Sequence, residues 1–203
     1  MIYFDRLFAL KEKYKAALDE DASKRAKIEK DFADGWTTDA CRKYELERQA
    51  EALEYCRGTT LEAAEDVKAE AYTMLDRWDT LDAAKLPANA AFLAGNSPVT
   101  LTQEEMQQFV DENRYNSTAL RAAREAADRR GLVLAFPPTA AERKEAFTLF
   151  YDTIAGAIRA GLDSGFYSVK DADKLLQAKI EANPNLADLE AVAASVTGEG
   201  AAV

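Results

Sequence analysis

Apolar residues recur at helical spacing along most of the chain. In residues 2–33 they follow alternating steps of three and four, at Phe4, Leu7, Tyr14, Leu18, Ile28 and Phe32. Lys11, Asp21 and Arg25 fall in the same stripe, and three charges in one seam disfavour a sustained coiled coil. The pattern predicts a long amphipathic helix that packs on other helices, or at best a short imperfect coiled coil. Gly35 is placed to end it.

Two further helices are predicted before the first break in the pattern. One covers residues 39–57 and stops at Gly58. The next covers residues 59–84 and begins with a Thr-x-x-Glu capping box. Three helices joined by short turns predict a long amphipathic N-terminal helical array over residues 1–86.

Residues 87–100 lack a helical period. Two prolines, a glycine and two asparagines interrupt the segment, and charged residues are absent from it. We interpret it as a linker between two domains, or as a functional loop, because Phe92 and Leu93 are apolar residues in an irregular stretch.

A smaller C-terminal helical unit is predicted over residues 101–183. It opens with a helix-turn-helix at 101–131, where Thr102 and Glu105 form a capping box. Residues 132–136 are the only strand-like run. They would form either an extended strap over the core or an edge that adds to a partner's sheet.

The end of the chain is predicted to hold two more helices and a tail. A strongly apolar helix covers residues 139–161, and another begins at Ser168 or Val169. Residues 184–203 are expected to be a weakly ordered tail, with at most one weak turn near Leu186 and Leu189.

The composition agrees with an all-α fold. Of the 203 residues, 40 are alanine, the best helix former, and only 13 are the strand formers valine and isoleucine. The net charge of −10 is shared evenly, with −5 on residues 1–100 and −5 on residues 101–203. Such an even acidic balance argues against a nucleic-acid footprint across the whole protein.

Several kinds of chemistry are not expected. Without histidine, imidazole metal sites and Ser-His-Asp or Cys-His catalysis are impossible. Cys41 and Cys56 are 15 residues apart on one predicted helix, about 22 Å, and cannot bridge each other. Acidic pairs are interpreted as solvated helix surface. We therefore expect no enzyme activity, no cofactor and no metal.

No membrane segment or secretory signal is predicted. No run approaches 18 apolar residues, and the first residues lack a basic region followed by an apolar run.

Two groups of residues are candidates for interaction. Residues 114–130 carry five arginines against two acids, and Arg121 and Arg124 lie on the second helix of the helix-turn-helix. They would present charge to phosphates, or form a solvated face near a helix C-terminus, which we favour because the preceding helix is acidic. The other candidates are aromatic residues in connecting segments or at helix ends: Trp36, Phe92, Phe136, Phe166 and Tyr167.

One segment resembles known proteins. The pattern Leu101-Thr-Gln-Glu-Glu-Met106, Phe109-Val110, Asn113, Tyr115-Asn116, Leu120-Arg121 and Ala126-Ala127 is similar to a short helical module. That module occurs in uncharacterised proteins from phage and prophage head-assembly gene neighbourhoods. The resemblance covers residues 101–131, implies a non-enzymatic virion or assembly protein, and carries over no catalytic residue.

These observations predict a non-enzymatic structural or assembly protein of a phage particle. Its partners would be copies of itself or other virion proteins, and it would reside in the virion or the host cytoplasm. The alternative is an acidic inhibitor that blocks a basic nucleic-acid-binding surface of a host enzyme, which evenly distributed acid would serve through electrostatic steering. Binding to nucleic acid or membrane is not expected.

Overall fold

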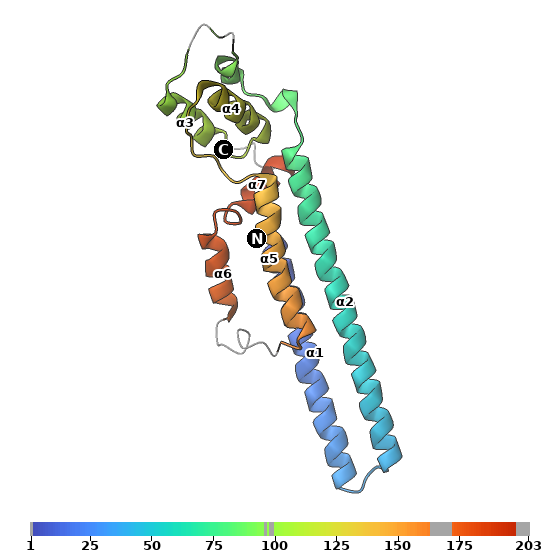
Figure 1. The fold of residues 1–203 in the computed structure, drawn as a ribbon. Helices are drawn as coiled ribbons and strands as arrows, with labels where there is room; N and C mark the ends of the chain where they lie inside the picture. The colour runs from blue at the N-terminus through green and yellow to red at the C-terminus, as the bar shows by residue number, and fades with distance from the viewer. Residues whose placement is uncertain (1, 96, 98–99, 163–171, 198–203) are drawn as a thin grey trace. The chain divides into compact units, whose positions relative to one another are not determined.

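The computed structural model describes all residues except 1, 96, 98–99, 163–171 and 198–203, and this part of the chain is all-helical, as predicted (Figure 1). The α-helices are α1 (Ile2–Ala33), α2 (Asp39–Asp79), α3 (Gln103–Glu112), α4 (Ser117–Arg130), α5 (Ala140–Arg159), α6 (Ala172–Ala182) and α7 (Leu189–Thr197). Two 3₁₀ helices, η1 (Ala83–Lys85) and η2 (Ala88–Leu93), lie between α2 and α3. None of these helices is long and apolar enough to cross a membrane.

The prediction that Gly58 ends a helix is wrong, because α2 runs through it without a break. The expected capping box at Thr59 does not form. Instead, the hydroxyls of Thr59 and Thr60 donate to the Cys56 carbonyl oxygen, at 3.1 and 2.7 Å. A hydroxyl bonded to a carbonyl one turn earlier is compatible with a continuous helix. The weak helix propensity of Gly58 costs only about 1 kcal/mol relative to alanine. That is too little to end a helix whose following turns bury Thr60, Ala64 and Val67.

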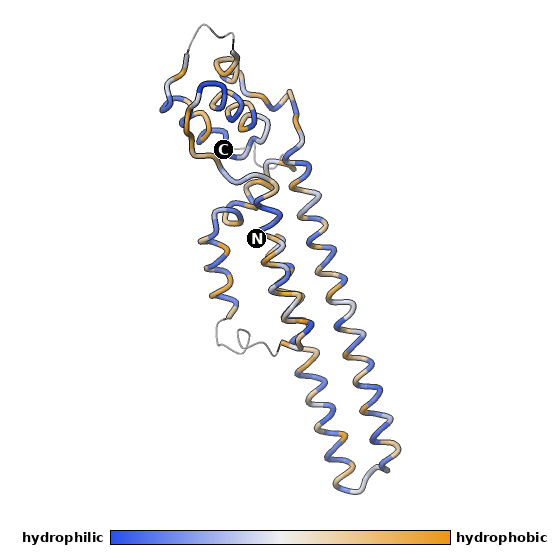
Figure 2. The backbone as a smooth tube through the Cα atoms, in the orientation of Figure 1, coloured by the Kyte–Doolittle hydropathy of each residue, from blue (hydrophilic) through white to orange (hydrophobic). Residues whose placement is uncertain are grey.

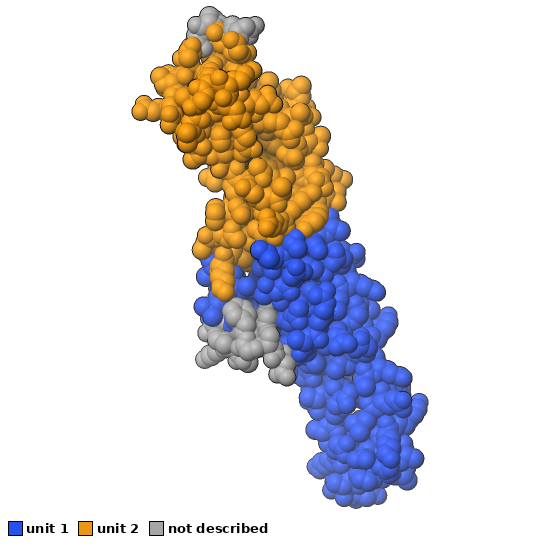
Figure 3. Space-filling model, in the orientation of Figure 1, with its two compact units in different colours: residues 1–70, 147–178 blue, residues 71–146, 179–203 orange. Residues whose placement is uncertain are grey.

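The chain divides into two compact units (Figure 3). Unit 1 contains residues 1–70 and 147–178, and unit 2 contains residues 71–146 and 179–203. This division does not coincide with the boundary expected at 87–100, because contacts depend on which helices pack together and not on where the helical pattern is interrupted. Residues 88–93 form η2, and its Ala90 and Leu93 are buried within unit 2.

Unit 1 is built on the antiparallel hairpin of α1 with the first part of α2 (Figure 1). Its core is an aromatic cluster in which Phe4 of α1 contacts Phe147 and Phe150 of α5, with ring centroids 5.6 and 5.0 Å apart. Burial, together with a hydrogen bond to Glu65, raises the pKa of Tyr151 to about 12.

The charges predicted to interrupt the α1 stripe are compensated. Lys11 is buried and pairs with Asp173 of α6 and with Glu12. Asp21 and Arg25 pair with each other at 2.7 Å, one helical turn apart. Burial of charge in this seam is therefore tolerated because each charge has a partner on the same or a neighbouring helix.

In unit 2, helices α3 and α4 form the predicted helix-turn-helix. The Thr102–Glu105 capping box is complete, Asn116 caps α4, and Gly131 ends α4 in the left-handed conformation at φ 64°. Alanines make much of the α4 contact surface, since Ala119, Ala123, Ala126 and Ala127 are all buried. Small side chains therefore make up most of the buried surface of α4.

Residues 132–136 are an extended strap and not a strand. The Gln107 side chain on α3 accepts from the Ala135 N–H at 2.8 Å and donates to the Ala135 carbonyl at 2.9 Å. Gln103 donates to the Val133 carbonyl at 3.0 Å. Glutamine side chains therefore bind backbone groups that a neighbouring strand would bind in a sheet.

The C-terminal part of unit 2 is more ordered than the predicted tail. Helix α7 buries Leu189, Val192 and Ala193, and Leu186 is also buried. These residues are spaced at i, i+3, i+6 and i+7, which is a short helical stripe and accounts for a helix where only a weak turn was expected.

Candidate functional site

Two large aromatic side chains are exposed along the first part of α2. Tyr44 and Tyr55 leave 64% and 75% of their surface in solvent. They lie 11 residues apart, which is about three helical turns, so they project from the same side of α2. Cys41, Arg48, Glu51 and Gly58 are exposed on that side as well. We call these six residues, Cys41, Tyr44, Arg48, Glu51, Tyr55 and Gly58, the α2 outer face.

The α2 outer face lies opposite the contact of α2 with α1. The less exposed side of α2 follows a three- and four-residue spacing at Arg42, Leu46, Gln49, Leu53, Cys56 and Thr60. With about 100° per residue, the centres of the two stripes are roughly 200° apart around the helix. The α2 outer face is therefore a second stripe and not an extension of the intramolecular seam.

The contact between α1 and the first part of α2 buries few side chains. Of residues 15–59, all of which the structure describes, Ile28 is the only one that is buried. Polar side chains occupy much of the seam, and Arg42 bonds Glu29 at 3.0 Å while its guanidinium lies 4.4 Å from the Phe32 ring centroid. Figure 2 shows polar and apolar residues alternating along both helices in this region. The hairpin thus buries little apolar surface of its own.

Trp36 is the first predicted interaction residue. It follows Gly35, which adopts φ 75° in the turn between α1 and α2, and 84% of its surface is exposed. A tryptophan this exposed at a hairpin turn contributes nothing to the hairpin core. It is suited to contact with another molecule, since aromatic side chains are enriched at interface centres.

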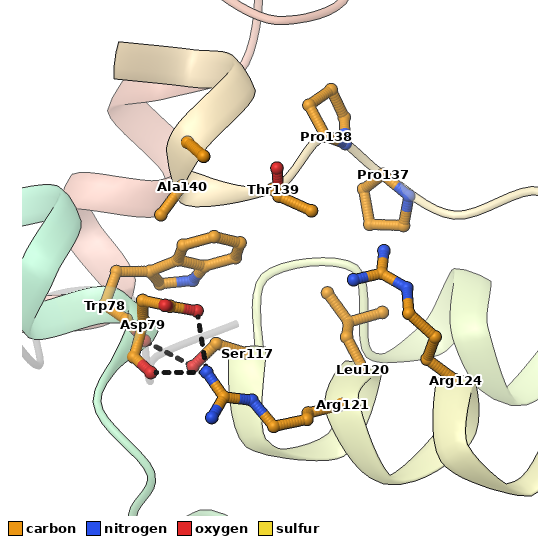
Figure 4. Close-up of a pocket in the computed structure, with 11 residues that line it drawn as sticks. Trp78, Asp79, Ser117, Leu120, Arg121, Arg124, Pro137, Pro138, Thr139 and Ala140 are labelled. Atoms are coloured by element: carbon orange, nitrogen blue, oxygen red, sulfur yellow. Dashed lines mark hydrogen bonds and ion pairs between the residues drawn. The ribbon is translucent and has the colours of Figure 1, made fainter.

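Arg121 and Arg124 are brought together at a cavity of unit 2 (Figure 4). The cavity has a volume of about 220 Å³ and is lined by the end of α2, by α4 and by residues 137–141. Arg121 pairs with Asp79 at 3.2 Å. The Arg124 guanidinium lies 4.7 Å from the ring centroid of Phe136. The cavity is smaller than ordinary ligand pockets, which begin at about 300 Å³.

The other α4 arginines also bind groups of unit 2. Arg129 donates to the Leu93 carbonyl at 3.0 Å and Arg130 to the Phe92 carbonyl at 3.3 Å. Phe92 is partly exposed and Leu93 is buried. These contacts place the positive segment against η2 and the end of α2, which favours an internal role for its charge over presentation to phosphates.

Phe136 is half-buried beneath Arg124. Phe166 and Tyr167 lie outside the residues that the structure describes. The structure therefore gathers Arg121, Arg124 and Phe136 at one place, whereas Trp36 lies in the other unit. Among the described residues, no three or more Cys, Asp or Glu side chains are grouped as metal ligands would be.

Arg143 is a residue of unit 2 that the sequence interpretation missed. Its side chain is fully buried, pairs with Asp188, and donates to the carbonyls of Pro138 and Asn185 at 3.3 and 3.4 Å. Its guanidinium carbon lies 5.6 Å from the Trp78 ring centroid. Arg143 lies in the same helical stripe as the apolar residues of α5, and this spacing could have indicated that its side chain is buried.

The comparisons give no relative from which a function could be transferred. No known protein family, no curated protein and no solved structure matches this chain.

Proposed function

We propose that the protein is a non-enzymatic structural or assembly component that acts through protein–protein contacts made by the α1–α2 hairpin. One observation carries the proposal: residues 15–59 bury only Ile28, while Trp36, Tyr44 and Tyr55 are exposed. A helix in a folded protein gains most of its stability from packing its apolar face against other elements. A long hairpin with little internal burial and exposed aromatics is typical of an element that packs on a partner.

The phage particle is the proposed setting. It rests on the resemblance of residues 101–131 to a module of head-assembly gene neighbourhoods, and the hairpin would supply the contacts. Self-association or incorporation into a larger particle would follow from the same surface.

The test is the size of the assembly that contains the protein in its native source. We expect the chain to elute well above the 22.4 kDa of one copy. The variant Tyr44→Ser with Tyr55→Ser should shift it toward the single-copy position. Leu149→Ser is the matched control, because Leu149 is exposed to a similar degree on α5, at 66%. Elution of the unmodified chain as a single copy from its native source would contradict the proposal.

A further inference from the structure

We infer that the α2 outer face binds a second copy of this chain, with the two α2 helices antiparallel and Tyr44 of each copy against Tyr55 of the other. The inference rests on the proposed function, because it names the partner of the same surface. It follows from the order of residues along the face, from the charges that lack a partner, and from a glycine that the single chain does not explain.

The order of residues along the α2 outer face is self-complementary. Tyr44 and Tyr55 are centred between residues 49 and 50, and so are Arg48 and Glu51. Cys41 and Gly58 share that centre as well. A two-fold axis through this point would set tyrosine against tyrosine, arginine against glutamate and the cysteine against the glycine. A two-fold interface requires such self-complementarity, in which residue i meets j and j meets i.

The two central charges of the α2 outer face, Arg48 and Glu51, form no ion pair within the described part of the chain. The other cations of residues 39–57 all form ion pairs. Arg42 pairs with Glu29 and Asp39, Lys43 also pairs with Asp39, and Arg57 pairs with Glu54. Neither Arg48 nor Glu51 forms an ion pair with any residue that the structure describes. In the antiparallel arrangement each would meet the opposite charge on the other copy. In a parallel arrangement Arg48 would meet Arg48, which disfavours that alternative.

Gly58 supports the same contact. It lies inside α2, where glycine is less favourable than alanine. A Cβ atom added there would meet nothing within 4 Å, so packing within the chain does not require a glycine. In the antiparallel pair the second helix would run past this position and could come closer to the backbone because no side chain intervenes. The facing residue, Cys41, is also small.

The overall charge of the hairpin permits self-association. Residues 15–59 carry nine basic and eleven acidic side chains, so this region is close to neutral although the whole chain carries −10. Glu47 and Glu54 flank the α2 outer face and would approach the same residues of the other copy. Glu54 is already paired with Arg57, which reduces the repulsion.

The contact is small. The face from Cys41 to Gly58 is about 26 Å long at 1.5 Å per residue. Two helices touching over that length belong to the class of weak, transient interfaces, for which we expect a dissociation constant of roughly micromolar order.

Sedimentation velocity of the full chain at concentrations up to about 100 µM tests the inference, since this range spans the expected dissociation constant. We expect a reversible dimer. Arg48→Glu or Glu51→Arg should each weaken dimerisation about tenfold or more, because two attractive contacts become repulsive. The double variant Arg48→Glu with Glu51→Arg should restore it. Lys27→Glu, an equal charge change on the exposed side of α1, should have no effect.

A chain that stays monomeric over this range overturns the inference. So does a dimer whose dissociation constant is unchanged by both charge reversals, and so does a double variant that fails to restore dimerisation. The proposed function fails separately. If the chain is monomeric when pure but the two tyrosine substitutions still remove it from its native assembly, only the inference is overturned. If the chain dimerises when pure and elutes from its native source at the size of one copy, only the proposed function is contradicted.

Discussion

Removing the carboxylate of Asp188 would leave the Arg143 guanidinium buried without a counter-charge. Arg143 is fully buried, and Asp188 is the acid that pairs with it. Arg143 would keep its hydrogen bonds to the carbonyls of Pro138 and Asn185. One of its nitrogens, Nη2, is buried and has no hydrogen-bond partner among the described residues. Burying the Arg143 guanidinium therefore already costs desolvation free energy, and Asp188→Ala would leave that cost without the compensating ion pair.

Breaking one side of a buried ion pair costs about 3–5 kcal/mol. We expect Asp188→Ala near the lower end, about 3 kcal/mol, because the carbonyl contacts remain. Arg143→Met removes the buried charge and keeps most of the volume, so it should cost less. Asp188 would then be partly exposed and still paired with Arg114 at 3.2 Å. The double variant should be more stable than the sum of the two single effects predicts.

Urea unfolding followed by tryptophan fluorescence measures these differences in the free energy of unfolding, with a reporter next to Arg143. The chain has two tryptophans, and Trp36→Phe would leave Trp78, next to Arg143, as the reporter. Loss of about 3 kcal/mol is a large part of an ordinary folding free energy of 5–15 kcal/mol. A cost below about 1 kcal/mol for Asp188→Ala would show that Asp188 does not compensate the buried charge of Arg143. A cost for Arg143→Met larger than that for Asp188→Ala would show the same.

Three further predictions concern other parts of the chain. Gly58→Ala should raise the free energy of unfolding by about 0.5–1 kcal/mol, measured by thermal melting at low protein concentration, because the added methyl meets nothing within 4 Å; destabilisation would contradict this. Gln107→Leu should cost about 1 kcal/mol and speed hydrogen exchange at the Ala135 amide, whereas Gln108→Leu, which loses only a bond to Glu112, should leave that amide protected. Because the pKa of Tyr151 is about 12 in the folded chain and ordinarily 10.0, its contribution to stability should be present below pH 10 and decrease as the pH rises toward 12. Tyr151→Phe should remove this part of the alkaline dependence in unfolding measured at several pH values, and an unchanged profile would contradict the assignment.

Much of the fold was predictable because local signals and packing agree. The Thr102–Glu105 capping box and the Gly131 helix end both formed where the sequence placed them. The stripe from Phe4 to Phe32 is the side of α1 that is least exposed. Gly58 was misjudged because its weak helix propensity is a small local effect, whereas the part of α2 that follows it is held by buried residues such as Ala64 and Val67.

The candidate surface was only partly predictable. Trp36 was identified from its position between two helices, and it is exposed. The α2 outer face was missed because Tyr44 and Tyr55 are separated by charged residues, and their exposure depends on which side of α2 packs on α1. Arg143 and Asp188 are 45 residues apart, and no local pattern indicates such a pair.

Contact between the α2 outer faces of two copies can be tested by mixing two charge variants. Arg48→Glu and Glu51→Arg each place like charges opposite each other in the antiparallel pair, but one copy of each variant restores both attractive contacts. Analytical ultracentrifugation should therefore find each variant mainly monomeric alone and an equimolar mixture mainly dimeric. A mixture that sediments as the average of its two components would show that the α2 outer faces do not pair in this antiparallel arrangement.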